Sequence, residues 1–181
     1  MATPCVRWQL LPVEMTQQSQ LVLKRAQTQL DRQLLTKLGV RTLAYRPLGQ
    51  PYVPQRPRMN VAISHSERLV LVAVAPQRIG VDVEHLRGLS VDRLTRAFTA
   101  SEWRYLNRLT PERRQRVALK LWTAKEAVLK LVGCGLTRPP REVAVALPRC
   151  QRATFGGQTY RLTPLRLPQG YVGTGAQLAN L

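Results

Sequence analysis

The stretch Ile79-Gly80-Val81-Asp82-Val83-Glu84 decides the fold prediction for this chain, and residues 122–130 (WTAKEAVLK) complete it. Apolar and partly β-branched residues surround the two acids of the first stretch, which predicts a buried strand. Asp82 and Glu84 are two residues apart, so they project from the same face of that strand. The second stretch predicts a helix, and residues spaced four apart lie on one of its faces, namely Trp122, Glu126 and Lys130.

Acidic residues are scarce in this chain, which makes their clustering informative. There are 10 Asp and Glu against 28 Lys and Arg. Two carboxylates on one face of an apolar strand repel each other unless a cation lies between them, and Mg²⁺ shared with substrate phosphates meets that need. A solvated strand end and an ordinary surface Lys–Glu pair are the alternatives. Lysine is also scarce, yet three of the five lysines fall on the predicted helix, which favours a phosphate site there.

These two stretches, together with Ile63-Ser64-His65-Ser66 upstream, resemble the three signature blocks of 4′-phosphopantetheinyl transferases. The resemblance runs from Arg46 to Thr137 and is strongest to the Sfp type, a single chain of two similar halves. Such enzymes transfer the phosphopantetheine arm of coenzyme A to a serine of an acyl- or peptidyl-carrier protein, with Mg²⁺, and release 3′,5′-ADP. The resemblance implies an α+β fold of two similar α/β halves, with the active site at their junction. We therefore expect halves at residues 1–88 and 89–181.

The resemblance also assigns the chemistry to particular residues. Asp82, Glu84 and Glu126 are expected to hold Mg²⁺ against the diphosphate of coenzyme A. Lys130 is expected to neutralise charge on the transferring phosphoryl group, with help from Lys125. Glu126, acting directly or through a metal-bound water, is the candidate base for the acceptor serine.

Coenzyme A is expected to contact a second group of residues, besides Lys125 and Lys130. Ser64 and His65 lie in a predicted turn and are expected to bind coenzyme A, and His65 would meet its 3′-phosphate together with Arg32 of the N-terminal helix. Read alone, His65 fits a structural hydrogen-bonding role, and Arg32 fits a solvated helix face. Gln50 and Pro51 stand where relatives have Lys-Pro after a glycine, so one nucleotide contact lacks its ammonium group. Arg46 and Arg56 are the candidate substitutes.

The segment after the acidic strand is the expected docking surface for the carrier protein. In relatives this segment forms the surface on which the carrier helix docks, and an apolar centre with an arginine rim suits an acidic helix. The alternative is that the apolar residues are all core and the arginines form a solvated face. The expected docking residues are Leu89, Arg93, Leu94, Arg96, Ala97 and Phe98.

The whole-chain composition permits two rival functions. A net charge of +18 and a pI near 11.4 are typical of nucleic-acid-binding proteins. However, the arginines are scattered, aromatic residues make up 6% of the chain, and we find neither helix-turn-helix nor zinc-finger spacing. The other rival is an inactive relative that binds carrier proteins as a scaffold. The complete set of three acids, Asp82, Glu84 and Glu126, argues against it.

Cysteine content and hydropathy bear on location. Three cysteines without metal-ligand spacing suggest that the protein resides in the reducing environment of the cytosol. We find neither a leader pattern nor eighteen consecutive apolar residues, so we expect a cytoplasmic monomer without a membrane span.

Periodicity predicts a helix followed by three strands, twice. The first helix covers Leu23 to Leu38 and is closed by Gly39, and strands follow at 60–63, 69–74 (buried on both faces) and 79–84. The second half contains a capping box at residues 99–102 and a long helix from Thr110-Pro111 to Gly133. Strands at 143–147, 158–167 and 171–178 complete it.

Overall fold

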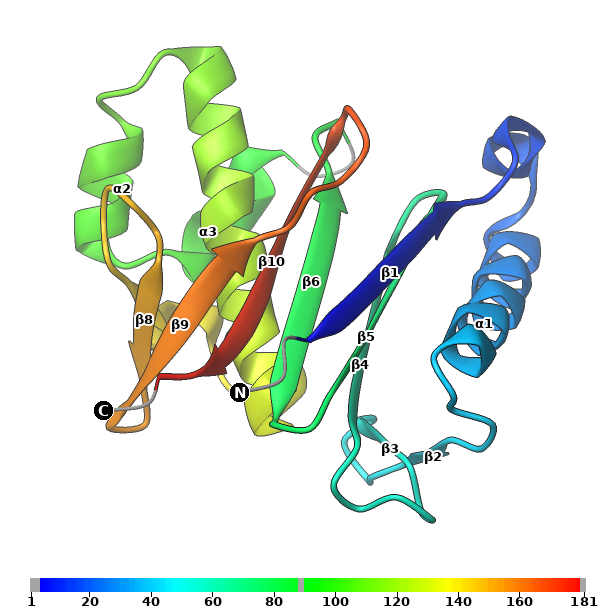
Figure 1. The fold of residues 1–181 in the computed structure, drawn as a ribbon. Coiled ribbons are helices and arrows are strands. Elements are labelled where there is room, and N and C mark those ends of the chain that lie inside the picture. Colours follow the sequence, from blue (N-terminus) through cyan, green and yellow to red (C-terminus); the bar gives the residue numbers. More distant parts are fainter. Residues whose placement is uncertain (1–3, 88–89, 180–181) are drawn as a thin grey trace.

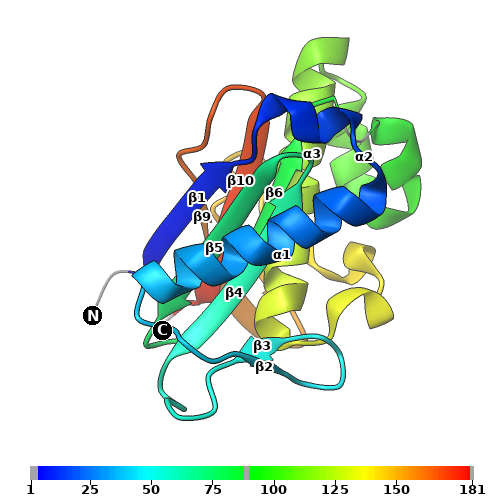
Figure 2. The same ribbon diagram turned by 90° about the vertical axis from the view of Figure 1, so that its right-hand side faces the viewer.

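The computed structural model of the chain describes residues 4–87 and 90–179. In this part of the chain two five-stranded antiparallel sheets pack against each other, and a long helix covers the outer side of each (Figures 1 and 2). The strand orders are β1-β5-β4-β3-β2 and β6-β10-β9-β8-β7. The predicted α+β class is confirmed.

The first sheet and its helix come from the first 75 residues. A 3₁₀ helix, η1 (Val13–Gln17), precedes α1 (Gln20–Lys37). The strands are β1 (Cys5–Leu10), β2 (Ala44–Tyr45), β3 (Pro51–Tyr52), β4 (Asn60–Ser66) and β5 (Leu69–Ala75). Helix α1 ends where predicted, because Gly39 adopts a φ of 80°.

The second sheet is covered by α3 (Pro111–Val132), with α2 (Ala100–Leu106) beside it. Its strands are β6 (Ile79–His85), β7 (Ala144–Val145), β8 (Arg152–Phe155), β9 (Gln158–Pro164) and β10 (Tyr171–Leu178). Three short 3₁₀ helices lie between these elements, namely η2 (Val91–Ala97), η3 (Gly135–Thr137) and η4 (Pro140–Glu142). The predicted capping box is present at Thr99 and Glu102.

Strand β5 lies at the centre of the packing and is buried on both faces, as predicted. Val70 and Val72 pack toward α1, whereas Leu69, Leu71 and Ala73 pack toward β6. All five residues have 0% exposure. Burial of each large apolar side chain contributes about 1.5–3 kcal/mol, so this strand anchors both interfaces of the first sheet.

Helix α3 approaches β6 closely because residue 80 is glycine. A Cβ atom on Gly80 would lie 1.9 Å from the carbonyl oxygen of Ala127, well inside van der Waals contact. The same face of β6 carries Asp82 and Glu84, since side chains alternate along a strand. The close packing therefore places both acids directly against α3.

Several predicted boundaries were wrong. Ser64, His65 and Ser66 belong to β4, and the turn follows at Glu67, which has a φ of 48°. The strand predicted at 143–147 is only Ala144–Val145, and the one at 158–167 ends at Pro164. Strands β1, β2, β3 and β8 were not predicted. Strands β2, β3 and β8 have only two, two and four residues. Strand β1 does alternate apolar and polar residues, but its pairing with the distant β5 cannot be read from local sequence.

The division into halves remains a prediction, but the hydrogen bonding places one strand differently. Strand β6 pairs with β10 in the second sheet, although the expected boundary at residue 88 assigned it to the first half. No helix in the described part of the chain has the length and apolar character needed to cross a membrane.

Candidate active site

The candidate site lies where β6 meets α3. Asp82 and Glu84 face the helix, and α3 presents Trp122, Glu126 and Lys130 on the facing side, as the four-residue spacing predicts. Lys130 Nζ lies 2.7 Å from Asp82 Oδ1. Trp122 Nε1 donates to Glu84 Oε1 at 3.2 Å. The structure therefore brings together the acidic strand and the Lys-Glu helix from distant parts of the sequence.

Two serines of β4 complete the site and cover the free edge of β6. Ser64 Oγ donates to Asp82 Oδ1 at 2.8 Å, and Ser66 Oγ donates to Glu84 Oε2 at 2.9 Å. Each hydroxyl also accepts a hydrogen bond from a backbone amide at the edge of β6. Val83 N donates to Ser64 Oγ, and His85 N donates to Ser66 Oγ. Lys130 Nζ donates to Ser64 Oγ at 2.9 Å. The serines fix the direction of both carboxylates and join the first sheet to the second.

The carboxylates in this site disfavour one another's ionisation. Burial, followed by repulsion from Asp82, raises the pKa of Glu126 to about 7, while Lys130 opposes the rise and Glu84 adds to it. Burial and then Asp82 also raise the pKa of Glu84. One oxygen, Asp82 Oδ2, is buried without a hydrogen-bond partner. Lys130 is thus the one described cation paired with this cluster, and it does not offset the effect of burial and neighbouring carboxylates on Glu84 and Glu126.

The carboxylates of Asp82, Glu84 and Glu126 are suitable ligands for a hard divalent cation, although they do not lie close enough together to coordinate one. Carboxylate oxygens are the ligands that Mg²⁺ prefers. Among residues 4–87 and 90–179, no group of three or more His, Cys, Asp or Glu side chains is close enough to hold a metal. Lys130 Nζ instead donates a hydrogen bond to Asp82 Oδ1. Metal binding would therefore require the carboxylates to close around the ion.

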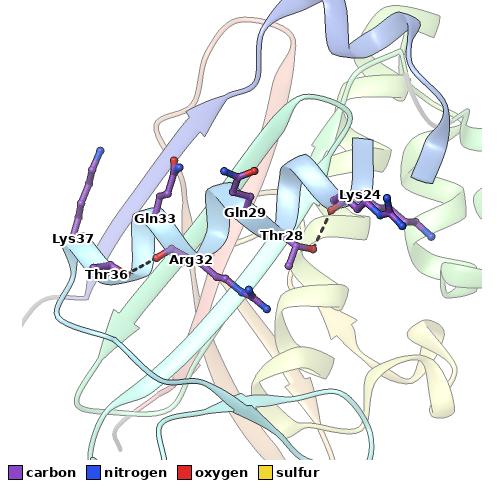
Figure 3. Close-up of a pocket in the computed structure, with 8 residues that line it drawn as sticks. Lys24, Thr28, Gln29, Arg32, Gln33, Thr36 and Lys37 are labelled. Atoms are coloured by element: carbon purple, nitrogen blue, oxygen red, sulfur yellow. Dashed lines mark hydrogen bonds between the residues drawn. The ribbon is translucent and has the colours of Figure 1, made fainter. Parts of the chain in front are cut away.

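His65 lies on the opposite face of β4 from Ser64 and is not part of this cluster. Its Nε2 is 2.7 Å from Asp31 Oδ2 of α1, and the histidine side chain is 31% exposed. Asp31 Oδ1 is buried without a partner. The next residue, Arg32, is exposed on the outer face of α1 (Figure 3).

One hollow of the described surface lies away from the carboxylate cluster, on α1. It measures about 880 Å³ and is lined by exposed side chains of α1 alone, including Arg32. The first sheet separates this helix from β6 (Figure 1). We therefore do not assign the reacting centre to it.

Gln50 and Pro51 line a smaller pocket of about 270 Å³ near the C-terminal end of α3. Arg46 and Arg78 line the same pocket. Gln50 Nε2 donates to the carbonyl oxygens of Lys130 and Leu131, both at 3.2 Å. The Gln50 amide thus caps the end of α3.

Lys125 lies away from the carboxylate cluster, and its expected contact with phosphate stays a prediction that this placement does not support. Its side chain has 0% exposure and its Nζ lies 2.9 Å from Glu102 Oε2. Successive helical residues are about 100° apart, because a turn contains about 3.6 residues. When Glu126 faces β6, Lys125 must therefore point elsewhere, and it points into the core beside α2.

The expected docking segment is only partly on the surface. Arg93 and Arg96 are exposed, whereas Leu94, Ala97 and Phe98 are buried at 4%, 5% and 5% exposure. The apolar centre expected for the carrier is thus core, as the alternative reading held. Leu89 lies outside the described residues. Of the expected docking residues that the structure describes, Arg93 and Arg96 are the exposed ones.

Sequence reasoning missed several partners of the site residues. Ser66, which holds Glu84, was quoted in the motif but given no role, and Trp122 was placed on the helix face without a partner. Asp31, which holds His65, was not singled out at all. Its position one residue before Arg32 on an otherwise basic helix is the signal that could have identified it.

Comparison with known proteins agrees with this geometry. The 4′-phosphopantetheinyl transferase superfamily matches residues 78–173, more than half of the chain, and the matched part includes both acids of β6 and all of α3. The chain therefore belongs to the 4′-phosphopantetheinyl transferase superfamily.

Individual relatives carry the same name. A 4′-phosphopantetheinyl transferase of Bacillus subtilis is 34% identical over 99 residues, covering 55% of this chain and 44% of the relative. The Sfp enzyme of B. subtilis strain 168 is 32% identical over the same shares of the two chains. The HetI enzyme of Nostoc is 40% identical over 109 residues, covering 57% of this chain and 46% of the relative. The chain spans about half the length of the curated relatives it matches.

Proposed function

We propose that this protein transfers the 4′-phosphopantetheine group of coenzyme A to a serine of an apo acyl- or peptidyl-carrier protein, in a reaction that depends on Mg²⁺. The supporting observation is the convergence of Asp82, Glu84, Glu126 and Lys130 at the junction of β6 and α3. All four residues lie in the part of the chain that the superfamily matches. The names of the relatives support the same activity.

Asp82, Glu84 and Glu126 are the residues that would hold the cation. When bound there, Mg²⁺ would neutralise the diphosphate and orient it for displacement. The unpartnered Asp82 Oδ2 supports this assignment, as do the pKa values of Glu84 and Glu126, which burial and then repulsion from Asp82 raise. Ser64 and Ser66 would keep the carboxylates in place during the reaction.

The transfer is a displacement at the phosphorus that carries the pantetheine. The acceptor serine oxygen forms a bond to this phosphorus, and the bond from phosphorus to the bridging oxygen breaks. The leaving 3′,5′-ADP keeps the electron pair of that bond. The serine proton passes to the Glu126 carboxylate, which is buried beside the cluster. Lys130, whose side chain is 31% exposed, would stabilise the charge that develops on the phosphoryl oxygens.

The nucleotide end of coenzyme A would occupy the pocket near Gln50 and Pro51. Arg46 and Arg78 supply positive charge there in place of the missing lysine. His65 and Arg32 remain the proposed contacts of the 3′-phosphate. The exposed Arg93 and Arg96 would receive the acidic helix of a carrier protein.

Intact-mass analysis of several apo carrier proteins tests the proposal. Each carrier is incubated with coenzyme A, Mg²⁺ and this protein, and the mass of one phosphopantetheine should appear on at least one. Glu126→Gln should abolish the product, and Glu112→Gln, an exposed glutamate of the same helix, is the matched control. Absence of the product on fatty-acid, polyketide and peptide carriers alike would reject the proposed function.

A further inference from the structure

Lys125 and Glu102 form a buried ion pair whose hydrogen bonds are satisfied on every side. Lys125 is 0% and Glu102 1% exposed, with 2.9 Å between Nζ and Oε2. The same Oε2 accepts the amide of Thr99 at 2.8 Å, and Oε1 accepts the amide of Val145 at 3.2 Å. Lys125 Nζ donates in addition to the carbonyl oxygen of Val143.

This network connects the segment that carries Arg93 and Arg96 with the helix that carries Glu126. Glu102 lies in the first turn of α2, directly after η2, which carries Arg93 and Arg96. Lys125 lies on α3, immediately before Glu126. The bonds to Val143 and Val145 add the segment at β7. A single cluster thus connects α2, α3 and the segment at β7.

Stability alone does not account for such a pair. Removing two charges from water is costly, and apolar residues of similar volume often stabilise a fold as well or better. Burial lowers the pKa of Lys125, which reflects this cost, whereas Glu102 opposes the shift. A buried pair does, however, define relative position, because its geometry is satisfied in only one arrangement.

We infer that Lys125 and Glu102 are positioning residues that hold the η2 segment in the place where it receives the carrier protein. This inference rests on the proposed function, and it replaces the direct contact with phosphate that the sequence suggested for Lys125. Neither side chain touches substrate. The pair acts through the location of Arg93 and Arg96.

Steady-state kinetics of Lys125→Met and Glu102→Gln test the inference, with Lys120→Met, an exposed lysine of the same helix, as the matched control. Both variants should raise the KM for the carrier about tenfold, within the range for residues coupled in one network, and leave the KM for coenzyme A within about twofold. The control should change neither constant. In addition, the charge reversal Arg93→Glu with Arg96→Glu should have a smaller effect in the Lys125→Met background than in the wild type.

Other outcomes would overturn the inference. A higher KM for coenzyme A in Lys125→Met, but not in Glu102→Gln, would restore a direct contact between Lys125 and phosphate. A lower kcat with both KM values unchanged would mean that the pair only maintains the fold.

Hydrogen exchange separates this inference from the proposed function, because it needs no substrate. Even if wild-type protein modifies no carrier, amides of residues 91–106 and Val145 should exchange faster in Lys125→Met and Glu102→Gln than in Lys120→Met. Unchanged exchange in that segment would contradict the positioning role.

Discussion

Glu126 carries a conflict between stability and chemistry within a single side chain. It is buried beside Asp82 and Glu84, and its pKa of about 7 lies above the 4.5 of an ordinary glutamate. The unfolded chain therefore ionises Glu126 more readily than the folded protein does. Without divalent ions, stability should fall as the pH rises from about 4.5 to about 7 and then stay at its lower level.

Glu126→Gln should therefore stabilise the metal-free protein at pH 8, by at most about 3 kcal/mol, because it removes a buried charge. Thermal unfolding in EDTA at pH 8 and pH 4.5 measures this effect, and the gain should disappear at the lower pH. Carrier modification by the same variant should fall by about a thousandfold or more. A melting temperature below that of wild type at pH 8 would show that the carboxylate is not under repulsion.

His65 makes a prediction about the 3′-phosphate. If it contacts this phosphate, wild type should prefer coenzyme A over 3′-dephospho-coenzyme A. His65→Ala should reduce that preference by about 1.5–3 kcal/mol, the contribution of a hydrogen bond to a charged group. The measurement is the ratio of kcat/KM for the two substrates. An unchanged ratio in the variant would assign the phosphate to Arg32, Arg46 or Arg56.

At the scale of elements, the packing of α3 on β6 depends on Gly80. Gly80→Ala should destabilise the protein by about 1–3 kcal/mol, as expected for overpacking in a core, because the new methyl group collides with Ala127. Urea unfolding measures the loss. Gly175→Ala is the matched control on the neighbouring β10, since a Cβ there would meet nothing nearer than 3.6 Å. Equal stability of the two variants would refute the close approach.

The η2 segment makes a second prediction at this scale. Arg93→Glu combined with Arg96→Glu should raise the KM for an acidic carrier and leave the KM for coenzyme A nearly unchanged, since both arginines are exposed. Titrations of each substrate measure the two constants. If the double variant modifies the carrier normally across its titration, this face does not bind the carrier.

The same elements show what sequence patterns predict and what they leave open. Period and spacing correctly placed Asp82 and Glu84 on one strand face and Glu126 and Lys130 on one helix face. Lys125 was assigned to the site on the family resemblance, although the step of about 100° between helical neighbours turns it away from the face of Glu126. Similarly, the partners Ser66 and Asp31 depend on contacts between distant segments, which local periodicity does not contain.

At the scale of the whole molecule, positive charge is largely uncompensated within the fold. The net charge is +18, and Arg138, paired with Glu142, is the one arginine in an ion pair among the described residues. Such a surface attracts any polyanion, and both coenzyme A and acidic carriers meet that description. The KM for the carrier should therefore rise with salt, because surface charges are screened beyond about 8 Å at physiological ionic strength.

We propose that Asp82 and Glu84 of β6 and Glu126 of α3, the helix that covers the same sheet, act together through a divalent cation. The most direct test follows carrier modification by intact mass while Mg²⁺ is titrated into chelator-treated protein, with Asp82→Ala alongside. We expect no modification in excess EDTA and full recovery with Mg²⁺ in the wild type. Asp82→Ala should retain the wild-type fold by circular dichroism and show no recovery. Full activity of the wild type in excess EDTA would contradict the mechanism.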